Sequence, residues 1–324
     1  MTRVLALDVG GTNVRFAIAE VEARSVTLTP PVYAKGRDFG SLEDALDAHR
    51  SLFAGGAVER VSIAVAGPVV DGVCHMSNLS WTVDARAIER ATGLPTRVMN
   101  DFEAIALGVR YVPADALATL QEGKPIAGAA IAILGAGTGL GETLLVPTDA
   151  GDRVIASEGG HATLAALDDE DARFIAFMRK RLDGGHVSVE RAVSGSGLAA
   201  IFEWMEAEGL AKGSDALHAA LRDGDAGAAI GAAGTSGSDR AARAAVDRFV
   251  RFYGAEAGDL ALKSLPHGGV FVAGGIAAKI LPRMREGFMA PFLDKGRMRA
   301  LLETIPVHVI LDGDIGLRGA ASAR

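Results

Sequence analysis

The chain has 324 residues, 49% of them hydrophobic, a formal net charge of −7 and one cysteine, Cys74. The hydrophobic residues are enough to build a full core, which excludes a disordered chain. The sequence has no run of basic residues, so it does not support a nucleic-acid-binding surface. One cysteine excludes an internal disulfide and a cysteine-based zinc site, which favours a reducing compartment. We expect a cytoplasmic protein, because a strand from Val4 leaves no room for a secretory signal and no apolar run reaches the ~18 residues of a membrane helix.

Apolar segments at 4–7 and 14–18 predict two strands joined by a tight turn. Two adjacent glycines in the turn allow a positive φ and leave no Cβ atoms to block a ligand. Backbone N–H groups and a threonine hydroxyl can then surround a phosphate, while the carboxylate before the turn can hold a hydrated Mg²⁺. The residues concerned are Asp8, Gly10, Gly11, Thr12 and Asn13. A plain hairpin with a Gly-Gly turn is the other interpretation.

Strands at 61–66 and 96–99 alternate with helices at 84–92 and 102–110, which predicts a partly parallel sheet covered on both faces. The second of these strands leads to Asn100 and Asp101. An aspartate that opens a helix is commonly its N-cap, and the residues alone favour that role for Asp101.

A second hairpin of the same design follows, with apolar segments at 131–134 and 143–146 on either side of a Gly-rich turn. Thr138 lies 126 residues after Thr12 (138 − 12), so the two hairpins suggest an internal duplication with a ligand between the halves. Chance similarity of two short Gly-rich hairpins is the alternative. The spacing fits neither a dinucleotide-binding fingerprint nor a Walker A loop. The glycines and threonine expected at the phosphates are Gly135, Gly137, Thr138 and Gly139.

The rest of the chain predicts helices at 170–182, 198–208 and 241–262, and strands at 269–273 and 307–311 before a short helix at 316–321. The Ala- and Gly-rich stretch 211–245 predicts a surface helical excursion with a mobile loop at 231–237. The strand at 269–273 meets Gly274 and Gly275 at the start of a helix. The local signal favours neither a plain strand-to-helix turn nor a ligand-binding turn over the other.

Seven motifs occur in the order seen in bacterial glucokinases, and together they span residues 4 to about 320. They are D-V-G-G-T-N at 8–13, A-G-P-V at 66–69, N-D-F at 100–102, G-A-G-T-G-L-G at 135–141, E-G-G-H at 158–161, E-R at 190–191 and A-G-G-I at 273–276. The chain therefore resembles the ATP-dependent glucokinase family of the hexokinase/actin-like/Hsp70 superfamily. Two features depart from the family pattern: the run at 162–166, and Glu142, where a small or apolar residue is commoner.

The resemblance implies an α/β fold of the two-domain actin-like ATPase (ribonuclease H-like) type, with mixed sheets flanked by helices around a central cleft. It places a small domain at 1–110 plus 312–324 and a large domain at 111–311. It also implies transfer of a phosphoryl group from ATP to the 6-hydroxyl of D-glucose, with Mg²⁺ as cofactor, and a homodimer.

The same resemblance assigns roles to residues that would otherwise be ordinary. It makes Asp101 the base that accepts the hydroxyl proton, for which an ordinary low pKa suffices. It makes the turn at Gly274 and Gly275 part of the adenosine site. It implies a sugar site that contains Asn100, Asp101, Glu158, His161 and Glu190. Without it, the two glutamates are surface carboxylates and the histidine is a loop residue.

Two alternatives stay open. One is a kinase for another hexose or an N-acetylhexosamine, although the Cys-rich zinc motif of the related repressor/kinase group is absent. The other is an actin-like or Hsp70-like ATP-binding protein, which would not need Glu158, His161 and Glu190. A sugar-responsive transcription regulator is not expected, because the phosphate hairpin begins too early for a helix-turn-helix to precede it.

Overall fold

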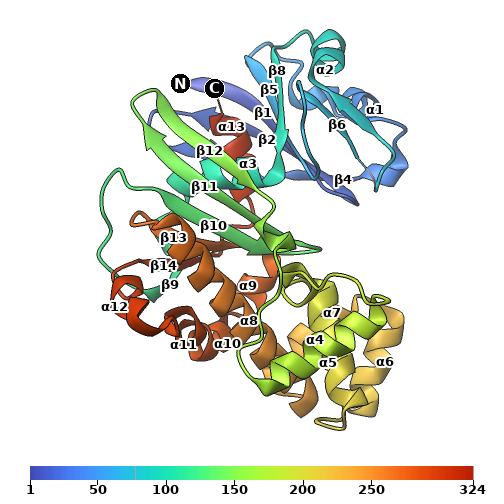
Figure 1. Cartoon of the computed structure of the whole chain (residues 1–324). Helices are drawn as coiled ribbons and strands as arrows, with labels where there is room; N and C mark the ends of the chain where they lie inside the picture. The colour runs from blue at the N-terminus through green and yellow to red at the C-terminus, as the bar shows by residue number, and fades with distance from the viewer. Residues whose placement is uncertain (77, 324) are drawn as a thin grey trace. The chain divides into compact units, whose positions relative to one another are not determined.

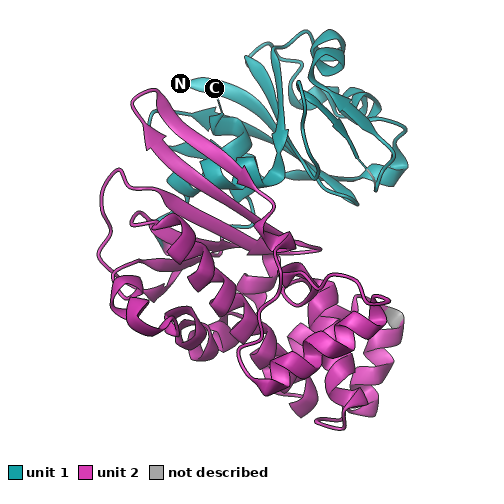
Figure 2. Ribbon diagram, in the orientation of Figure 1, with its two compact units in different colours: residues 1–114, 312–324 teal, residues 115–311 magenta. Residues whose placement is uncertain are grey.

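The computed structural model describes residues 1–76 and 78–323 and divides them into two compact units (Figures 1 and 2). Unit 1 contains Met1–Ala114 and Asp312–Arg324, and unit 2 contains Asp115–Leu311. Within residues 1–76 and 78–323, every helix is too short or too polar to cross a lipid bilayer.

Unit 1 is built on a six-stranded mixed sheet in the order β3-β2-β1-β5-β8, with β4 paired to β2. Its strands are β1 (Thr2–Val9), β2 (Asn13–Val21), β3 (Val26–Leu28), β4 (Val32–Lys35), β5 (Arg60–Val65) and β8 (Thr96–Asn100), and a separate hairpin joins β6 (Val73–His75) to β7 (Thr82–Asp84). Its α-helices are α1 (Leu42–Ala48), α2 (Ala85–Thr92), α3 (Asp101–Gly108) and α13 (Ile315–Ser322).

Strand β1 alternates between two cores, because its side chains point to opposite faces of the sheet. Leu5 and Leu7 belong to the core that also contains side chains of α1 and α2. Val4 and Ala6 pack with Leu317 of the C-terminal helix α13. Small residues on this second face let helices approach closely: a Cβ on Gly319 of α13 would overlap the backbone of α3. The last helix of the chain is therefore part of the unit that the first strand begins.

Unit 2 has a second six-stranded sheet in the order β12-β11-β10-β13-β14-β9. Its strands are β9 (Leu117–Gln121), β10 (Ile131–Ala136), β11 (Leu140–Thr148), β12 (Gly151–Ser157), β13 (Gly269–Ala273) and β14 (Val307–Ile310). Its α-helices are α4 (Asp169–Arg181), α5 (Gly195–Ala207), α6 (Asp215–Asp223), α7 (Ala226–Ser236), α8 (Arg240–Ser264), α9 (Gly275–Lys279), α10 (Leu281–Gly287), α11 (Met289–Leu293) and α12 (Arg299–Leu302).

The two sheets repeat one plan. In each, a Gly-rich turn joins two antiparallel strands, β1–β2 or β10–β11, and the first of the pair lies parallel to a later strand, β5 or β13. A further parallel strand, β8 or β14, follows in each sheet. A common plan of this kind is what an internal duplication predicts.

Helix α7 contradicts the predicted mobile loop at 231–237. The helix continues through Ser236 and ends at Gly237, whose φ of 73° is the left-handed conformation typical of a C-cap. Its glycines are required by packing, because a Cβ on Gly234 would lie 2.7 Å from the backbone oxygen of Ala242 in α8. Close helix packing thus explains a composition that looked typical of a loop.

Candidate active site

Asp101 and Asn100 lie where β8 ends and α3 begins. Asn100 is the N-cap: its Oδ1 accepts hydrogen bonds from the backbone N–H groups of Phe102 at 2.8 Å and Glu103 at 3.4 Å. Its Nδ2 donates to the carbonyl of Gly67 at 2.9 Å. Because Asn100 takes the capping role, the ordinary structural explanation for an aspartate here does not apply to Asp101.

The surroundings of Asp101 do not give its carboxyl group the ordinary low pKa that was expected. Burial raises the pKa of Asp101 to about 6, and the negative charge of Asp8 adds to this rise, while the backbone N–H of Phe102 opposes it. The expectation of an ordinary low pKa is therefore wrong. A carboxylate with this pKa is still ionised at neutral pH but is a better proton acceptor than an exposed aspartate.

Asp8 lies near the end of β1, directly opposite Arg15 in β2. The Arg15 guanidinium donates to the Asp8 carboxylate, and it also bonds Asp314 Oδ1 at 3.1 Å and the carbonyl of Gly313 at 2.7 Å. The Asp8 side chain is partly exposed (21%). The side chain is thus held in one orientation by Arg15 and is still open to solvent.

The turn after Asp8 is closed by a hydrogen bond from the Gly10 N–H to the Asn13 carbonyl at 3.0 Å. Neither Gly10 nor Gly11 has a positive φ, so the predicted left-handed conformation of the glycine pair is wrong. Gly11 is needed for space instead, since a Cβ there would lie 2.6 Å from the Asn78 side chain. Thr12 and Asn13 are exposed, as a phosphate-binding turn requires.

Asp8 can contact a hydrated Mg²⁺, but the described residues around it do not form a full set of metal ligands. In the described part of the chain, no three or more His, Cys, Asp or Glu side chains gather into a metal-binding group. Mg²⁺ keeps several of its waters and often takes only one or two carboxylates together with substrate phosphates. One partly exposed carboxylate, already oriented by Arg15, suits contact with such a hydrated ion through water.

The second Gly-rich turn, between β10 and β11, is held by its own backbone and by α5. The Gly137 N–H donates to the Gly139 carbonyl at 2.8 Å, and the Gly195 N–H at the start of α5 donates to the Gly137 carbonyl at 2.9 Å. Glu190 Oε2 accepts from the Leu140 N–H at 3.0 Å and occupies the space that a Cβ on Gly139 would need. Glu190 is therefore fixed on this turn.

The E-G-G-H segment forms a 3₁₀ turn, Gly159–His161, after β12. Glu158 and His161 are exposed, and Nε2 of the histidine lies 3.8 Å from Oε2 of the glutamate, so both side chains lie on one side of the turn. A Cβ on Gly160 would overlap the carbonyl of Leu140, so this turn packs against the β10–β11 turn. Unit 2 thus brings Glu158, His161 and Glu190 together with the second glycine turn.

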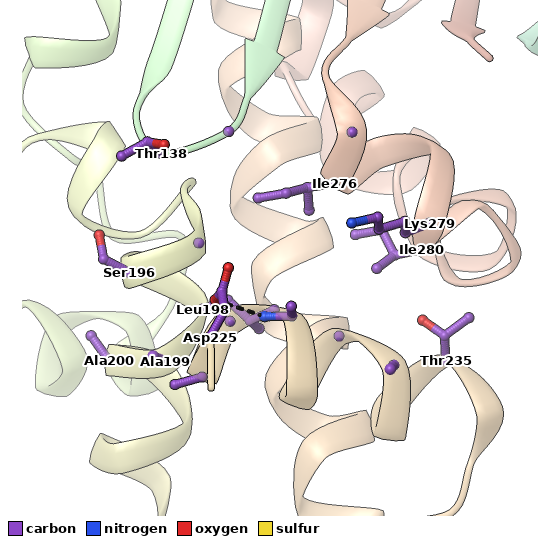
Figure 3. Close-up of a pocket in the computed structure, with 18 of the residues that line it drawn as sticks. Thr138, Ser196, Leu198, Ala199, Ala200, Asp225, Thr235, Ile276, Lys279 and Ile280 are labelled. Carbon is purple, nitrogen blue, oxygen red and sulfur yellow. Dashed lines mark hydrogen bonds between the residues drawn. The ribbon is translucent and has the colours of Figure 1, made fainter. Parts of the chain in front are cut away.

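A cavity of about 1150 Å³ opens beside the second glycine turn, within unit 2 (Figure 3). Its walls come from the β10–β11 turn, the start of α5, helix α7 and helix α9, and they are mostly apolar and small. The lining includes Thr138, Ser196, Leu198, Ala199, Asp225, Gly227, Gly231, Thr235, Gly275, Ile276, Lys279 and, from the end of α4, Arg181. Ligand sites are typically ~300–1,000 Å³ and largely apolar, so this cavity has room for a whole nucleotide.

The predicted site contains Gly137, Thr138 and Gly275 of this lining and lacks the residues from α4, α5 and α7. Lys279 lies one helical turn after Gly275 and could have been found from that spacing. The walls from α5 and α7 are alanines and glycines that carry no chemical signal of their own.

Gly274 joins β13 to α9 at the edge of the cavity. Its φ is 90° and its ψ is 150°, and a Cβ on it would lie 2.5 Å from the carbonyl oxygen of Ala136. Tyr253 of α8 connects the same two strand ends, since its hydroxyl accepts from the Ala136 N–H at 2.9 Å and donates to the Ala273 carbonyl at 3.4 Å. Both turns beside the cavity are thus fixed to one buried helix.

Known proteins match the whole chain. The family model "Glucokinase" matches residues 5–324. A glucokinase of Nostoc sp. is 38% identical over 338 residues, covering 99% of this chain and 98% of its own. A glucokinase of Caulobacter vibrioides is 37% identical over 319 residues, covering 98% and 93%.

Among solved structures, the glucokinase from an Antarctic psychrotroph is 32% identical with a TM-score of 0.85, covering 99% of this chain and 98% of its own. The Balamuthia mandrillaris glucokinase, solved in complex with glucose, has a TM-score of 0.81 at 24% identity, covering 99% and 92%, and supports the fold alone. These matches confirm the predicted fold class and enzyme class. The chain belongs to the glucokinase family.

Proposed function

We propose that this chain transfers the γ-phosphoryl group of ATP to the 6-hydroxyl of D-glucose, giving glucose 6-phosphate and ADP. The observation that best supports this proposal is the nucleotide-sized cavity of unit 2, which shares its glycine turn with Glu190 and the Glu158–His161 turn. A coupled ADP assay with glucose, mannose, fructose and N-acetylglucosamine tests it. Turnover that is highest with glucose supports the proposal, whereas equal ATP hydrolysis with and without sugar contradicts it.

In the proposed mechanism, the protein positions the reactants and accepts one proton. Asp101 takes the proton of the 6-hydroxyl as the oxygen forms its bond to phosphorus and the bond to the ADP oxygen breaks. Because the transition state is loose, this proton transfer comes late and needs no strong base. Mg²⁺, when bound with ATP beside Asp8, neutralises phosphate charge.

The nucleotide part of the proposal rests on backbone groups and on the cavity. The turn at 135–141 offers backbone N–H groups to the phosphates, and the cavity beside Gly275 receives the adenosine. Lys279 and Arg181 add positive charge to the lining. The turn at Asp8–Asn13, with its exposed Thr12, is a second phosphate contact in this proposal.

The pH dependence of turnover follows from the raised pKa of Asp101. The base must be ionised to act, so kcat/KM for glucose should be level between about pH 7 and 7.5 and fall about ten-fold per pH unit below about pH 6. Initial rates between pH 4.5 and 7.5 in a buffer of constant ionic strength provide the measurement. A profile that stays level down to about pH 5, as the usual pKa of an exposed aspartate would give, would contradict the raised pKa.

The sugar turn gives a second prediction. Glu158→Ala should raise KM for glucose about 10- to 100-fold, because a hydrogen bond from a neutral hydroxyl to a carboxylate contributes ~1.5–3 kcal/mol. KM for ATP should change little. Glu208→Ala, an exposed glutamate at the end of α5, is the matched control. Equal glucose KM values for the two variants would exclude Glu158 from the sugar site.

Two further parts of the proposal come from the family resemblance. Asn100 is included in the sugar site although its observed hydrogen bonds are structural, and its second amide hydrogen is the one offered to a hydroxyl. Homodimerisation is also inferred from the resemblance, and the sedimentation coefficient of the purified chain tests it. A cytoplasmic location is proposed on other grounds, because a single cysteine suits a reducing compartment.

A further inference from the structure

Two buried carboxyl groups lie beneath the proposed sugar site. Glu142 lies on β11, opposite Leu134 of β10 and Ser157 of β12. Glu256 lies on α8. Their exposed fractions are only 4% and 6%, and in the described part of the chain Oε1 of each has no hydrogen-bond partner. Glu142 is also the residue that departs from the family pattern, so its burial needs a physical explanation.

The two glutamates interact with each other and share a small set of neighbouring charges. Burial raises the pKa of Glu142 to about 8, and the adjacent Glu256 carboxylate raises it further in the same direction; burial also raises the pKa of Glu256. The groups that face the pair are Lys263, Asp259 and the Tyr253 hydroxyl on α8, and Lys295 after α11.

These neighbouring charges stabilise one negative charge on the pair but not two. Lys263 Nζ lies 3.8 Å from Glu256 Oε1, which leaves a gap longer than a hydrogen bond. Lys295 is already paired with Asp259 at 2.6 Å. Two carboxylates sharing a buried site hold a proton between them, because two buried like charges repel strongly at short range.

Glu142, one member of the pair, is in direct contact with the sugar turn. A Cβ on Gly159 would overlap Oε2 of Glu142, so the carboxyl group lies against the backbone between Glu158 and His161. Movement of the Glu142 carboxyl group therefore displaces the turn that presents both side chains.

We propose that Glu142 and Glu256 are positioning residues that share one proton, and that loss of this proton displaces the 158–161 turn and weakens glucose binding. The doubly ionised pair repels itself and draws in water, which moves the Glu142 carboxylate away from its place under Gly159. The inference rests on the proposed function, because it concerns the affinity of the same sugar site.

The test compares the wild-type enzyme with Glu142→Gln between pH 6.5 and 9.5. An amide keeps a hydrogen-bond donor at this position but cannot ionise. We expect KM for glucose of the wild type to rise several-fold above about pH 8, with kcat and KM for ATP nearly constant. Glu142→Gln and Glu256→Gln should keep KM within about two-fold of the wild-type value at pH 7 and should show no rise.

Each result has a defined meaning. A wild-type KM that stays flat from pH 7 to 9.5 overturns the inference, and this measurement does not require any variant to fold. A rise that persists in both glutamine variants also overturns it. Glu158→Ala separates this inference from the proposed function: an unchanged glucose KM in that variant excludes the proposed sugar site itself. A raised KM there, together with a flat wild-type profile, excludes only the carboxyl pair.

Discussion

Asp101→Asn is expected to lower kcat about 10²- to 10⁴-fold, the range that a positioned general base contributes. The asparagine is nearly the same size and can still accept the Phe102 N–H, which bonds Asp101 Oδ1 at 3.0 Å. KM for glucose and the melting temperature should therefore stay close to those of the wild type. Steady-state kinetics with a thermal unfolding curve measure both effects.

Asp169→Asn is the matched control. Asp169 is also the first residue of an α-helix whose N-cap, Asp168, is supplied by the preceding residue. The change removes the same charge from the same helical position, at a residue outside the predicted site. If both variants lose activity equally, or if Asp101→Asn retains near wild-type turnover, Asp101 is not the base.

Gly274→Ala has the second largest expected effect. Its φ of 90° and ψ of 150° lie in a region that side-chain-bearing residues essentially avoid, at a cost of ~1–3 kcal/mol. The new methyl group would also meet the Ala136 carbonyl oxygen at 2.5 Å. The backbone cannot easily move apart there, because Tyr253 bonds both Ala136 and Ala273, the residue before Gly274. We expect the free energy of unfolding to fall by at least about 1–3 kcal/mol and KM for ATP to rise more than ten-fold.

A comparison with Gly275→Ala separates the effect of backbone strain at Gly274 from the effect of adding a methyl group to the nucleotide cavity. Gly275 has no positive φ, and a Cβ there meets nothing within 4 Å. Urea unfolding should therefore show a stability near that of the wild type, whatever happens to nucleotide affinity. If Gly274→Ala is as stable as Gly275→Ala and binds ATP equally well, the turn is not under the constraint described here.

The buried parallel strands of both sheets were predictable because such strands are continuous apolar runs bounded by glycine. Strands 131–134 and 269–273 of the prediction correspond to β10 and β13. Strand β12, Gly151–Ser157, was largely missed because most of its residues are exposed and polar, which leaves no periodic signal.

The candidate site was predictable where chemistry and spacing coincide. Glu158 and His161 are three residues apart with two glycines between them, and the structure places them on one side of their turn. The cavity walls from α5 and α7 could not be predicted, because Ala and Gly line a pocket only through helix packing that one sequence does not reveal. The raised pKa of Asp101 was likewise hidden, since burial depends on the tertiary fold.

Helix α13 has a consequence for how the protein is made. Unit 2 is one continuous stretch, Asp115–Leu311, whereas unit 1 needs Asp312–Arg324 to close over Val4 and Ala6. During synthesis, which proceeds from the N-terminus, unit 1 stays incomplete until residues 312–324 have been made and have left the ribosome. Unit 2 can form its core earlier, so the order of folding on the ribosome is the reverse of the order of translation.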